Sequence, residues 1–243
     1  MRRMRDAVLA GMMTGALMAL ATGCGGSASS PQSPVHSSAA PKSTEASSGT
    51  ASGAPAGPPP AGYRWVGSAA QGVWFAVPDN WVAVNLAKVS VGQALSRFAP
   101  KGLSSSYLKT ALAELSQRHA VFVADLASAV RSAHQFATNG NAYCEPTALE
   151  PGASSSSALQ SLVRAEYAQF HAHVLAIGSV TIDGDPGIKA EFTITTTAGI
   201  TLSQAQYTVL SKASRLCYVT LTTDNPAAFR RVFNKIGGTI HVS

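Results

Sequence analysis

Two histidines separated by a single residue, His171 and His173, form the pair in this sequence that comes nearest to a metal site. Alternate residues of a strand point to one face, so both imidazoles would reach the same ion there. A structural zinc ion takes four protein ligands, and no third or fourth ligand stands at a zinc-site spacing from this pair. We therefore predict no metal site and interpret the pair as an exposed helix end.

The spacing of the acidic and serine residues gives equally little support for catalysis. Asp183-Gly184-Asp185 begins like a calcium-binding loop, but Pro186 follows, and Ile194 stands where such a loop has its twelfth-position glutamate. The pentapeptide Gly-x-Ser-x-Gly, typical of serine hydrolases, does not occur. Paired carboxylates for glycoside cleavage would have to come from Glu114, Asp125, Glu145, Glu150, Glu166 and Glu191. Nothing singles out two of these, so we predict no catalytic residues and no cofactor, with a hydrolase as the less favoured alternative.

Cys24 is the residue whose surroundings predict a covalent modification. An uncharged run from Ala7 to Thr22 follows three arginines and ends in Leu20-Ala21-Thr22-Gly23-Cys24. This stretch resembles the signal peptide and lipobox of a bacterial lipoprotein. The resemblance implies a diacylglyceryl group on the Cys24 thiol, cleavage before Cys24 and acylation of the new N-terminus. Ala21 stands where a lipobox usually has Leu, Val or Ile, so ordinary signal-peptidase cleavage, or no cleavage, stays an alternative.

The length of this run favours an anchor over a spanning helix. Its roughly 16 residues fall short of the ~20 that cross a hydrocarbon core, and no basic flank follows. We predict that residues 1–23 are a signal peptide and that two or three acyl chains on Cys24 hold the protein to the cell membrane, on its extracytoplasmic side. The acyl chains on Cys24 would then be the protein's sole attachment to the membrane.

Residues 24–62 have the composition of a disordered tether. They are rich in Ser, Ala, Pro and Gly, have no aromatic residue, and carry only Lys42 and Glu45 as charged side chains. Such a segment cannot bury enough apolar surface to offset its ordering entropy. The net charge of the whole chain is +6, but no cluster of five or more Lys and Arg occurs, so we predict no nucleic-acid binding.

Two cysteines remain for the folded part once Cys24 is lipidated. Cys144 and Cys217 would share a compartment in which disulfides persist, and a bond between them closes a loop of about 74 residues. Two separate buried thiols are the alternative, because free cysteine packs as a small apolar residue.

Residues 63–243 read as one α+β domain with an antiparallel sheet flanked by helices. Alternating apolar residues predict a hairpin over 72–84, a strand over 136–144 and a meander of four strands between Val174 and Thr222. Helical spacing predicts helices over 108–115 and 159–170, and a third helix that Asn225 caps and Gly237-Gly238 end. The strand over 136–144 places Cys144 on one face and Asn139, Asn141 and Tyr143 on the other.

This order of elements resembles the PsbP-like α/β/α sandwich, and within it the LpqN-type lipoproteins of actinobacteria. The motifs that carry the resemblance are Val77-Pro78 followed by Trp81, and the strand from Phe136 to Asn141. It implies a non-catalytic binding or accessory protein of the cell envelope. Three tryptophans, Trp65, Trp74 and Trp81, lie near the start of the domain. Trp74 is on the opposite face of its strand from Phe75 and is the candidate for ligand contact. We expect a lipid or glycolipid ligand first, and a protein partner in the envelope second.

Overall fold

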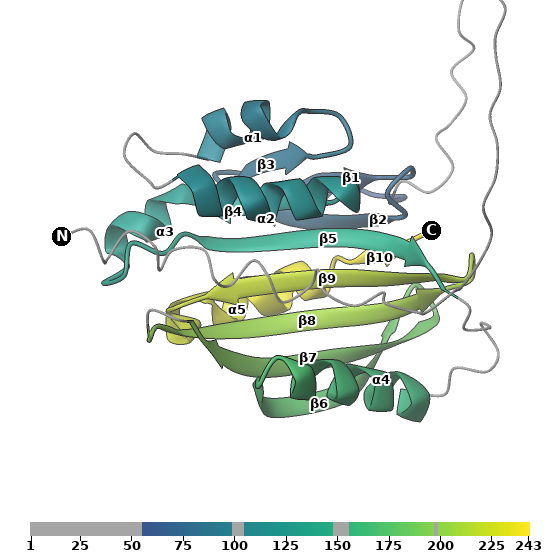
Figure 1. Cartoon of the computed structure of the whole chain (residues 1–243). Coiled ribbons are helices and arrows are strands. Elements are labelled where there is room, and N and C mark those ends of the chain that lie inside the picture. The colour runs from purple at the N-terminus through teal and green to yellow at the C-terminus, as the bar shows by residue number, and fades with distance from the viewer. Residues whose placement is uncertain (1–54, 99–104, 148–155, 197–198) are drawn as a thin grey trace, which may run out of the picture.

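Seven strands form one antiparallel sheet in the computed structural model, which describes residues 55–98, 105–147, 156–196 and 199–243 (Figure 1). Their spatial order is β3 (Val82–Asn85), β4 (Val121–Asp125), β5 (Thr138–Pro146), β9 (Arg215–Thr223), β8 (Thr201–Ser211), β7 (Asp185–Thr195) and β6 (His173–Ile182). The predicted meander is confirmed in β6 to β9. Asp183 and Gly184, both with positive φ, form the two-residue turn between β6 and β7, a backbone conformation that favours this residue pair. The predicted α+β class is confirmed.

The hairpin predicted over 72–84 is wrong. Strand β2 (Val73–Pro78) pairs instead with β1 (Tyr63–Ser68) and β10 (His241–Val242) in a separate three-stranded sheet, and β3 pairs with β4 in the large sheet. Alternation shows which face of a strand is buried but does not show its neighbour. Phe75 packs into one hydrophobic cluster and Val84 into another, so the turn after Pro78 carries the chain from one sheet to the other.

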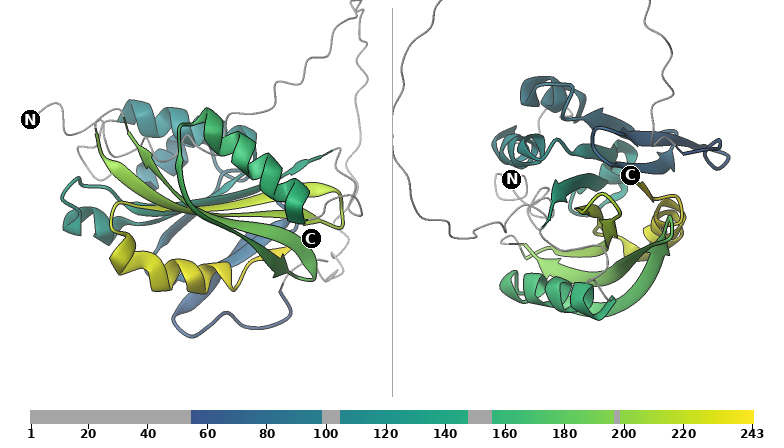
Figure 2. Two further views of the ribbon diagram at one scale, coloured as in Figure 1. Left: turned by 90° about the horizontal axis from the view of Figure 1, so that it is seen from below. Right: turned by 90° about the vertical axis from the view of Figure 1, so that its right-hand side faces the viewer.

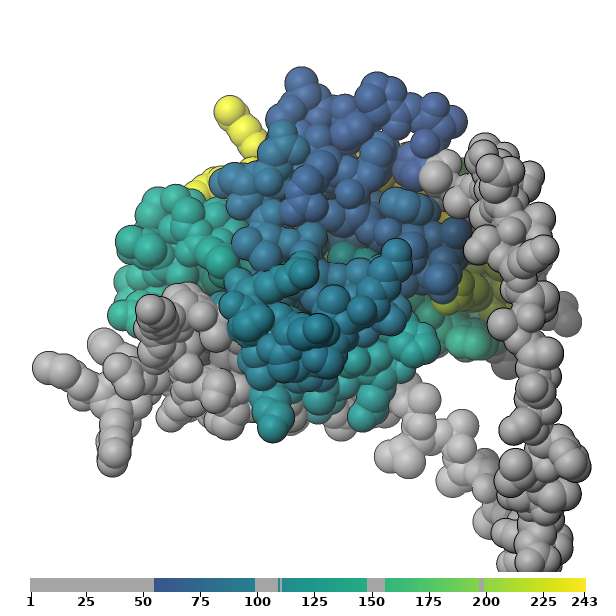
Figure 3. Space-filling model, turned by 90° about the horizontal axis from the view of Figure 1, so that it is seen from above, coloured from purple at the N-terminus to yellow at the C-terminus, as the bar shows by residue number. Residues whose placement is uncertain are grey.

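Helices lie on both faces of the large sheet. Two views in Figure 2 show α4 (Ser156–Gln169) and α5 (Pro226–Gly237) on opposite sides of it. Helices α1 (Val91–Phe98) and α2 (Ser105–Gln117) lie on the same face as α4, and Figure 3 shows them, with β1 to β3, from above. The predicted helices correspond to α2, α4 and α5. Helix α1 and the six-residue α3 (Leu126–Arg131) were not predicted.

Each face of the sheet has its own core. One cluster lies between the sheet and α1, α2 and α4, and the other between the sheet, the three-stranded sheet and α5. Strand β5 contributes side chains to both cores, because Tyr143 belongs to the first cluster and Cys144 to the second, as the alternation of the strand predicts. Cys144 and Cys217 face each other in the β5–β9 register and are joined by a disulfide, so the predicted pairing is confirmed.

The signal peptide 1–23, Cys24 and the tether as far as residue 54 lie outside the described residues. Gly57, which precedes β1, contacts that strand, because its carbonyl oxygen accepts a hydrogen bond from Trp65 Nε1 at 3.0 Å. Within the described part of the chain, no helix is long and apolar enough to cross a membrane.

Candidate functional site

Three rows of side chains cross the middle of the sheet on the face that carries α2 and α4. The pairing of β5 with β9 and of β9 with β8 sets them in register. They are Asn139–Thr222–Gln204, Asn141–Thr220–Gln206 and Tyr143–Tyr218–Thr208. We call the seven members other than the two tyrosines the polar grid, and none of the seven is more than 3% exposed. Uncharged hydrogen-bonding side chains therefore occupy a buried place where a sheet ordinarily carries apolar ones.

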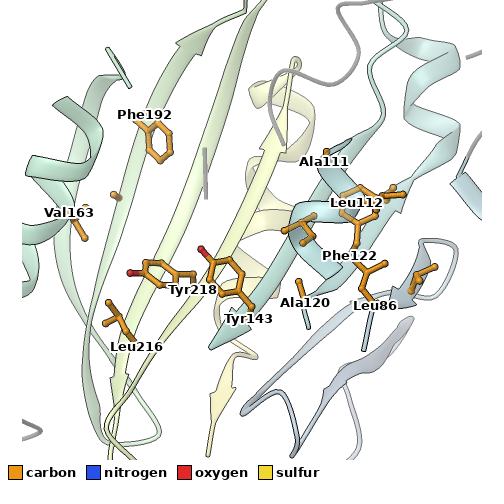
Figure 4. Packing of buried hydrophobic residues seen from close by; sticks show 14 of the residues in the cluster. Leu86, Ala111, Leu112, Ala120, Phe122, Tyr143, Val163, Phe192, Leu216 and Tyr218 are labelled. Carbon is orange, nitrogen blue, oxygen red and sulfur yellow. The ribbon is translucent and has the colours of Figure 1, made fainter. Parts of the chain in front are cut away.

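Apolar side chains continue the same rows on the neighbouring strands. Phe122 of β4 stands opposite Asn141, and Phe192 of β7 stands opposite Gln204. Of the helices on this face, α1 packs against β3, α4 packs against β6 and β7, and α2 packs against α1. Figure 4 shows the resulting division, with Val163 and Phe192 on one side of the two tyrosines and Phe122 on the other. The grid is thus a polar strip between two apolar flanks.

Part of the grid satisfies its own hydrogen bonds and part does not. Gln206 accepts from the Thr220 hydroxyl and donates to the Thr208 hydroxyl, each at 3.3 Å. Asn139 Oδ1, Asn141 Oδ1 and Thr222 Oγ1 are buried and have no hydrogen-bond partner in the described parts of the chain. Leaving one such atom unsatisfied costs about 1–3 kcal/mol. Three unsatisfied oxygens on one face indicate a place where something else donates hydrogen bonds.

A cavity of about 260 Å³ lies at the tyrosine end of the grid. It is lined by Arg118, Tyr143, Glu145, Leu162, Ala165, Glu166, Gln169 and Tyr218. The rings of Tyr143 and Tyr218 lie side by side with centroids 5.2 Å apart. Arg118 lies over the Tyr143 ring at 5.0 Å and donates from Nη1 to Glu145 Oε2 at 2.7 Å. We call this space the tyrosine cavity.

The tyrosine cavity holds a carboxyl group with an altered proton affinity. The pKa of Glu166 on α4 is raised to about 7, mainly by burial and also by the nearby Glu145, while Arg118 opposes the change. Burial also raises the pKa of Tyr143 and of Tyr218 above the usual value, so both hydroxyls keep their protons at neutral pH. A carboxyl group with a pKa of about 7 donates a hydrogen bond when it is protonated and only accepts hydrogen bonds when it is ionised, so its role depends on pH.

A larger cavity of about 540 Å³ lies on the other side of the molecule, where Trp81 and Asp125 contribute to its lining. Its carboxylates already have partners. Asp125 caps α3 through the Ala127 amide and pairs with Arg131 at 3.1 Å, and Asp224 accepts from the Ser132 hydroxyl. Because these groups are satisfied within the chain, the polar grid and tyrosine cavity are the better candidate site.

The residues singled out from the sequence lie elsewhere. Trp74 is half-buried in the three-stranded sheet and does not line the tyrosine cavity. His171 lies in the turn after α4, and His173 begins β6. No three metal-ligating side chains cluster within the described ranges. Sequence reasoning separated Asn139 and Asn141 from the Cys144 face, but it did not find the grid, whose remaining members are on β8 and β9.

The comparisons with known proteins give a distant structural likeness. No family model matches the chain, and no curated protein matches it. Among solved structures it is similar to cyanobacterial PsbP from Synechocystis sp. PCC 6803, with 13% identity over 79% of this chain and 99% of that chain, and a TM-score of 0.47. It is also similar to a Pseudomonas aeruginosa protein of unknown function, with 13% identity over 41% of this chain and 69% of that one, and a TM-score of 0.33. The PsbP-like resemblance and the LpqN type therefore stay predictions from the sequence.

Proposed function

We propose that the chain is an exported, lipid-anchored and non-catalytic binding module of the cell envelope, and that it holds a lipid or glycolipid over the polar grid. The observation that carries the proposal is the set of three unpartnered oxygens between two apolar flanks. The oxygens can accept hydrogen bonds from hydroxyl or amide groups of a ligand, and the apolar flanks can pack against its hydrocarbon chains. A molecule that offers both is an amphipathic lipid, which membrane anchoring through Cys24 would bring within reach.

A substitution in the grid separates binding from folding. We expect Asn141→Leu to raise the free energy of unfolding by about 1–2 kcal/mol, because it removes an unsatisfied buried oxygen. The same substitution should also abolish binding of the lipid to the polar grid. Both effects are measured on protein purified from a bacterial envelope, by thermal unfolding and by mass spectrometry of the lipid that solvent extracts from it.

Thr220→Val is the matched control, since Thr220 stands beside Asn141 in the same row and its hydroxyl already has a partner in Gln206. This variant should lose about 1 kcal/mol of stability and keep its ligand. If Asn141→Leu protein carries as much lipid as the unchanged protein, the grid is not the binding site.

The anchor is tested by Cys24→Ala. We expect this protein to move from the membrane fraction to the soluble fraction with an unchanged melting temperature, because the lipid alone would tie the domain to the membrane. Fractionation followed by immunodetection measures the change. Cys24→Ala protein that stays with the membrane would contradict the lipid tether.

One observation favours a second candidate function. A carboxyl group of raised pKa, Glu166, lines the same cavity as Glu145, and glycoside hydrolases use two such carboxyl groups as acid and as nucleophile or base. In that case Glu166→Gln would retain a bound glycolipid intact, while the unchanged protein would release its sugar over time. Equal recovery of intact ligand from both proteins would contradict hydrolysis and would be consistent with binding only.

A further inference from the structure

Strand β6 forms one edge of the seven-stranded sheet and is unusually open to pairing. The opposite edge, β3, has four residues, whereas β6 has ten. Its sequence, HVLAIGSVTI, contains no Lys, Arg, Asp, Glu or Pro. Natural sheets protect a long edge strand with charges, proline or bulges, because its outward N–H and C=O groups otherwise pair with another strand. Strand β6 has neither the charged residues nor the proline that would protect it.

A β-bulge protects only the beginning of strand β6. The register with β7 shifts between Val174 and Ala176, and from Ala176 to Ile182 the pairing runs without interruption. Within this regular stretch Ala176, Gly178, Ser179 and Thr181 are exposed, and just before it Leu175 is 58% exposed. Seven regular residues with small or aliphatic side chains therefore lie along an unprotected edge.

We propose that this edge pairs antiparallel with β6 of a second copy of the chain, which joins the two large sheets into one across a two-fold axis. An uncharged strand has no charge complementarity with which to select a different partner. A second copy supplies a strand of the same length that also has no charge. The two-fold arrangement uses the same edge on both copies and closes, so neither β6 is left open to recruit further copies, and the edges that remain in the joined sheet are the short β3 strands.

Full overlap of the regular stretch fixes the register. Ala176 to Ile182 is centred on Ser179, so Ser179 stands opposite Ser179 of the second copy, and Thr181 stands opposite Ile177. Directly opposed residues of antiparallel strands have Cα atoms about 4.5–5.5 Å apart, within the range of a disulfide. Two copies of Thr181 would be separated by four residues of strand, roughly 13 Å, which is beyond that range.

Cysteine substitution in the full chain, exported by a bacterial host, tests this pairing. We expect Ser179→Cys to give a disulfide-linked dimer as its main species on non-reducing electrophoresis. Thr181→Cys, on the same strand, and Val130→Cys, at a position 90% exposed on α3, should give no disulfide-linked dimer on the same gel. Equal dimer from all three variants would indicate random collision and overturn the proposal, as would a crosslink from Ser179→Cys to a different protein.

A second measurement covers the case in which the engineered disulfide does not form. Native mass spectrometry of the detergent-extracted chain should find dimer for the unchanged protein and for Val130→Lys. Ser179→Lys should be monomeric, because two lysines would face each other across the axis. A monomeric unchanged protein, or a Ser179→Lys protein that remains dimeric, would overturn the proposal.

Discussion

Replacing either Cys144 or Cys217 by serine will lower the free energy of unfolding by about 4 kcal/mol on the chain-entropy model. The two residues are 73 positions apart, and the segment between them includes α4 and strands β6, β7 and β8. Without the bond, the unfolded chain gains the conformations that a closed loop of this length excludes. For a domain of this size the melting temperature should fall by about 10 °C.

The comparison of single and double substitutions makes this expectation specific. Cys144→Ser, Cys217→Ser and the double variant should unfold within about 0.5 kcal/mol of one another, because each lacks the same bond. Reductant should lower the melting temperature of the unchanged protein to that level and leave the double variant unaffected. Strongly unequal effects of the two single substitutions would mean that the side chains contribute separately rather than through a shared disulfide.

Replacing Glu166 by glutamine will raise the free energy of unfolding above pH 7 by about 3 kcal/mol. The pKa of Glu166 rises from 4.5 to about 7 on folding, so the folded state holds its proton more tightly than the unfolded state. The favourable contribution of the protonated group is fully present below pH 4.5 and is lost as the pH rises to about 7. Glutamine carries no ionisable proton and avoids this loss.

Thermal unfolding between pH 4 and pH 9 measures the effect. The melting temperature of the unchanged protein should fall, relative to that of Glu166→Gln, between about pH 4.5 and pH 7, and the two should converge at the acidic end. Glu191→Gln is the control, because Glu191 pairs with Lys189 at 2.7 Å and its side chain is 46% exposed. A surface pair contributes less than about 1 kcal/mol. Parallel curves for the unchanged protein and Glu166→Gln would show that Glu166 titrates normally in the folded state.

The two expected results also separate structure from function, because they concern opposite faces of the sheet. The disulfide lies in the core shared with α5, on the opposite face from the grid, so its removal should weaken folding without changing the binding of the lipid that we propose. Glu166 lines the tyrosine cavity itself. A change there should therefore alter both the pH dependence of stability and the affinity for whatever the cavity holds.

Local patterns in the sequence determined much of this fold. Alternating apolar residues identified strands β6 to β9, and the strand around Asn141 was divided correctly into its two faces. Asn225 followed by Pro226 marked the start of α5, where the Asn225 side chain accepts from the Ala228 amide. The pairing of Cys144 with Cys217 followed from counting cysteines. Most of these inferences depend on residues close together in the chain; for the two cysteines, separate buried thiols were the alternative, and the register of β5 with β9 decided for the bond.

Only the tertiary structure decided which strands are neighbours, and with that the candidate site. Strand β2 alternates as a hairpin partner of β3 would, yet it belongs to a different sheet, because a period of two residues says nothing about the strand alongside. Asn141 meets Thr220 and Gln206 only through register across strands that are distant in sequence. Glu166 has its raised pKa because folding buries it near Glu145 of β5. Local sequence patterns identified most of the elements, though not α1 or α3, and the long-range pairing of the strands made the candidate site.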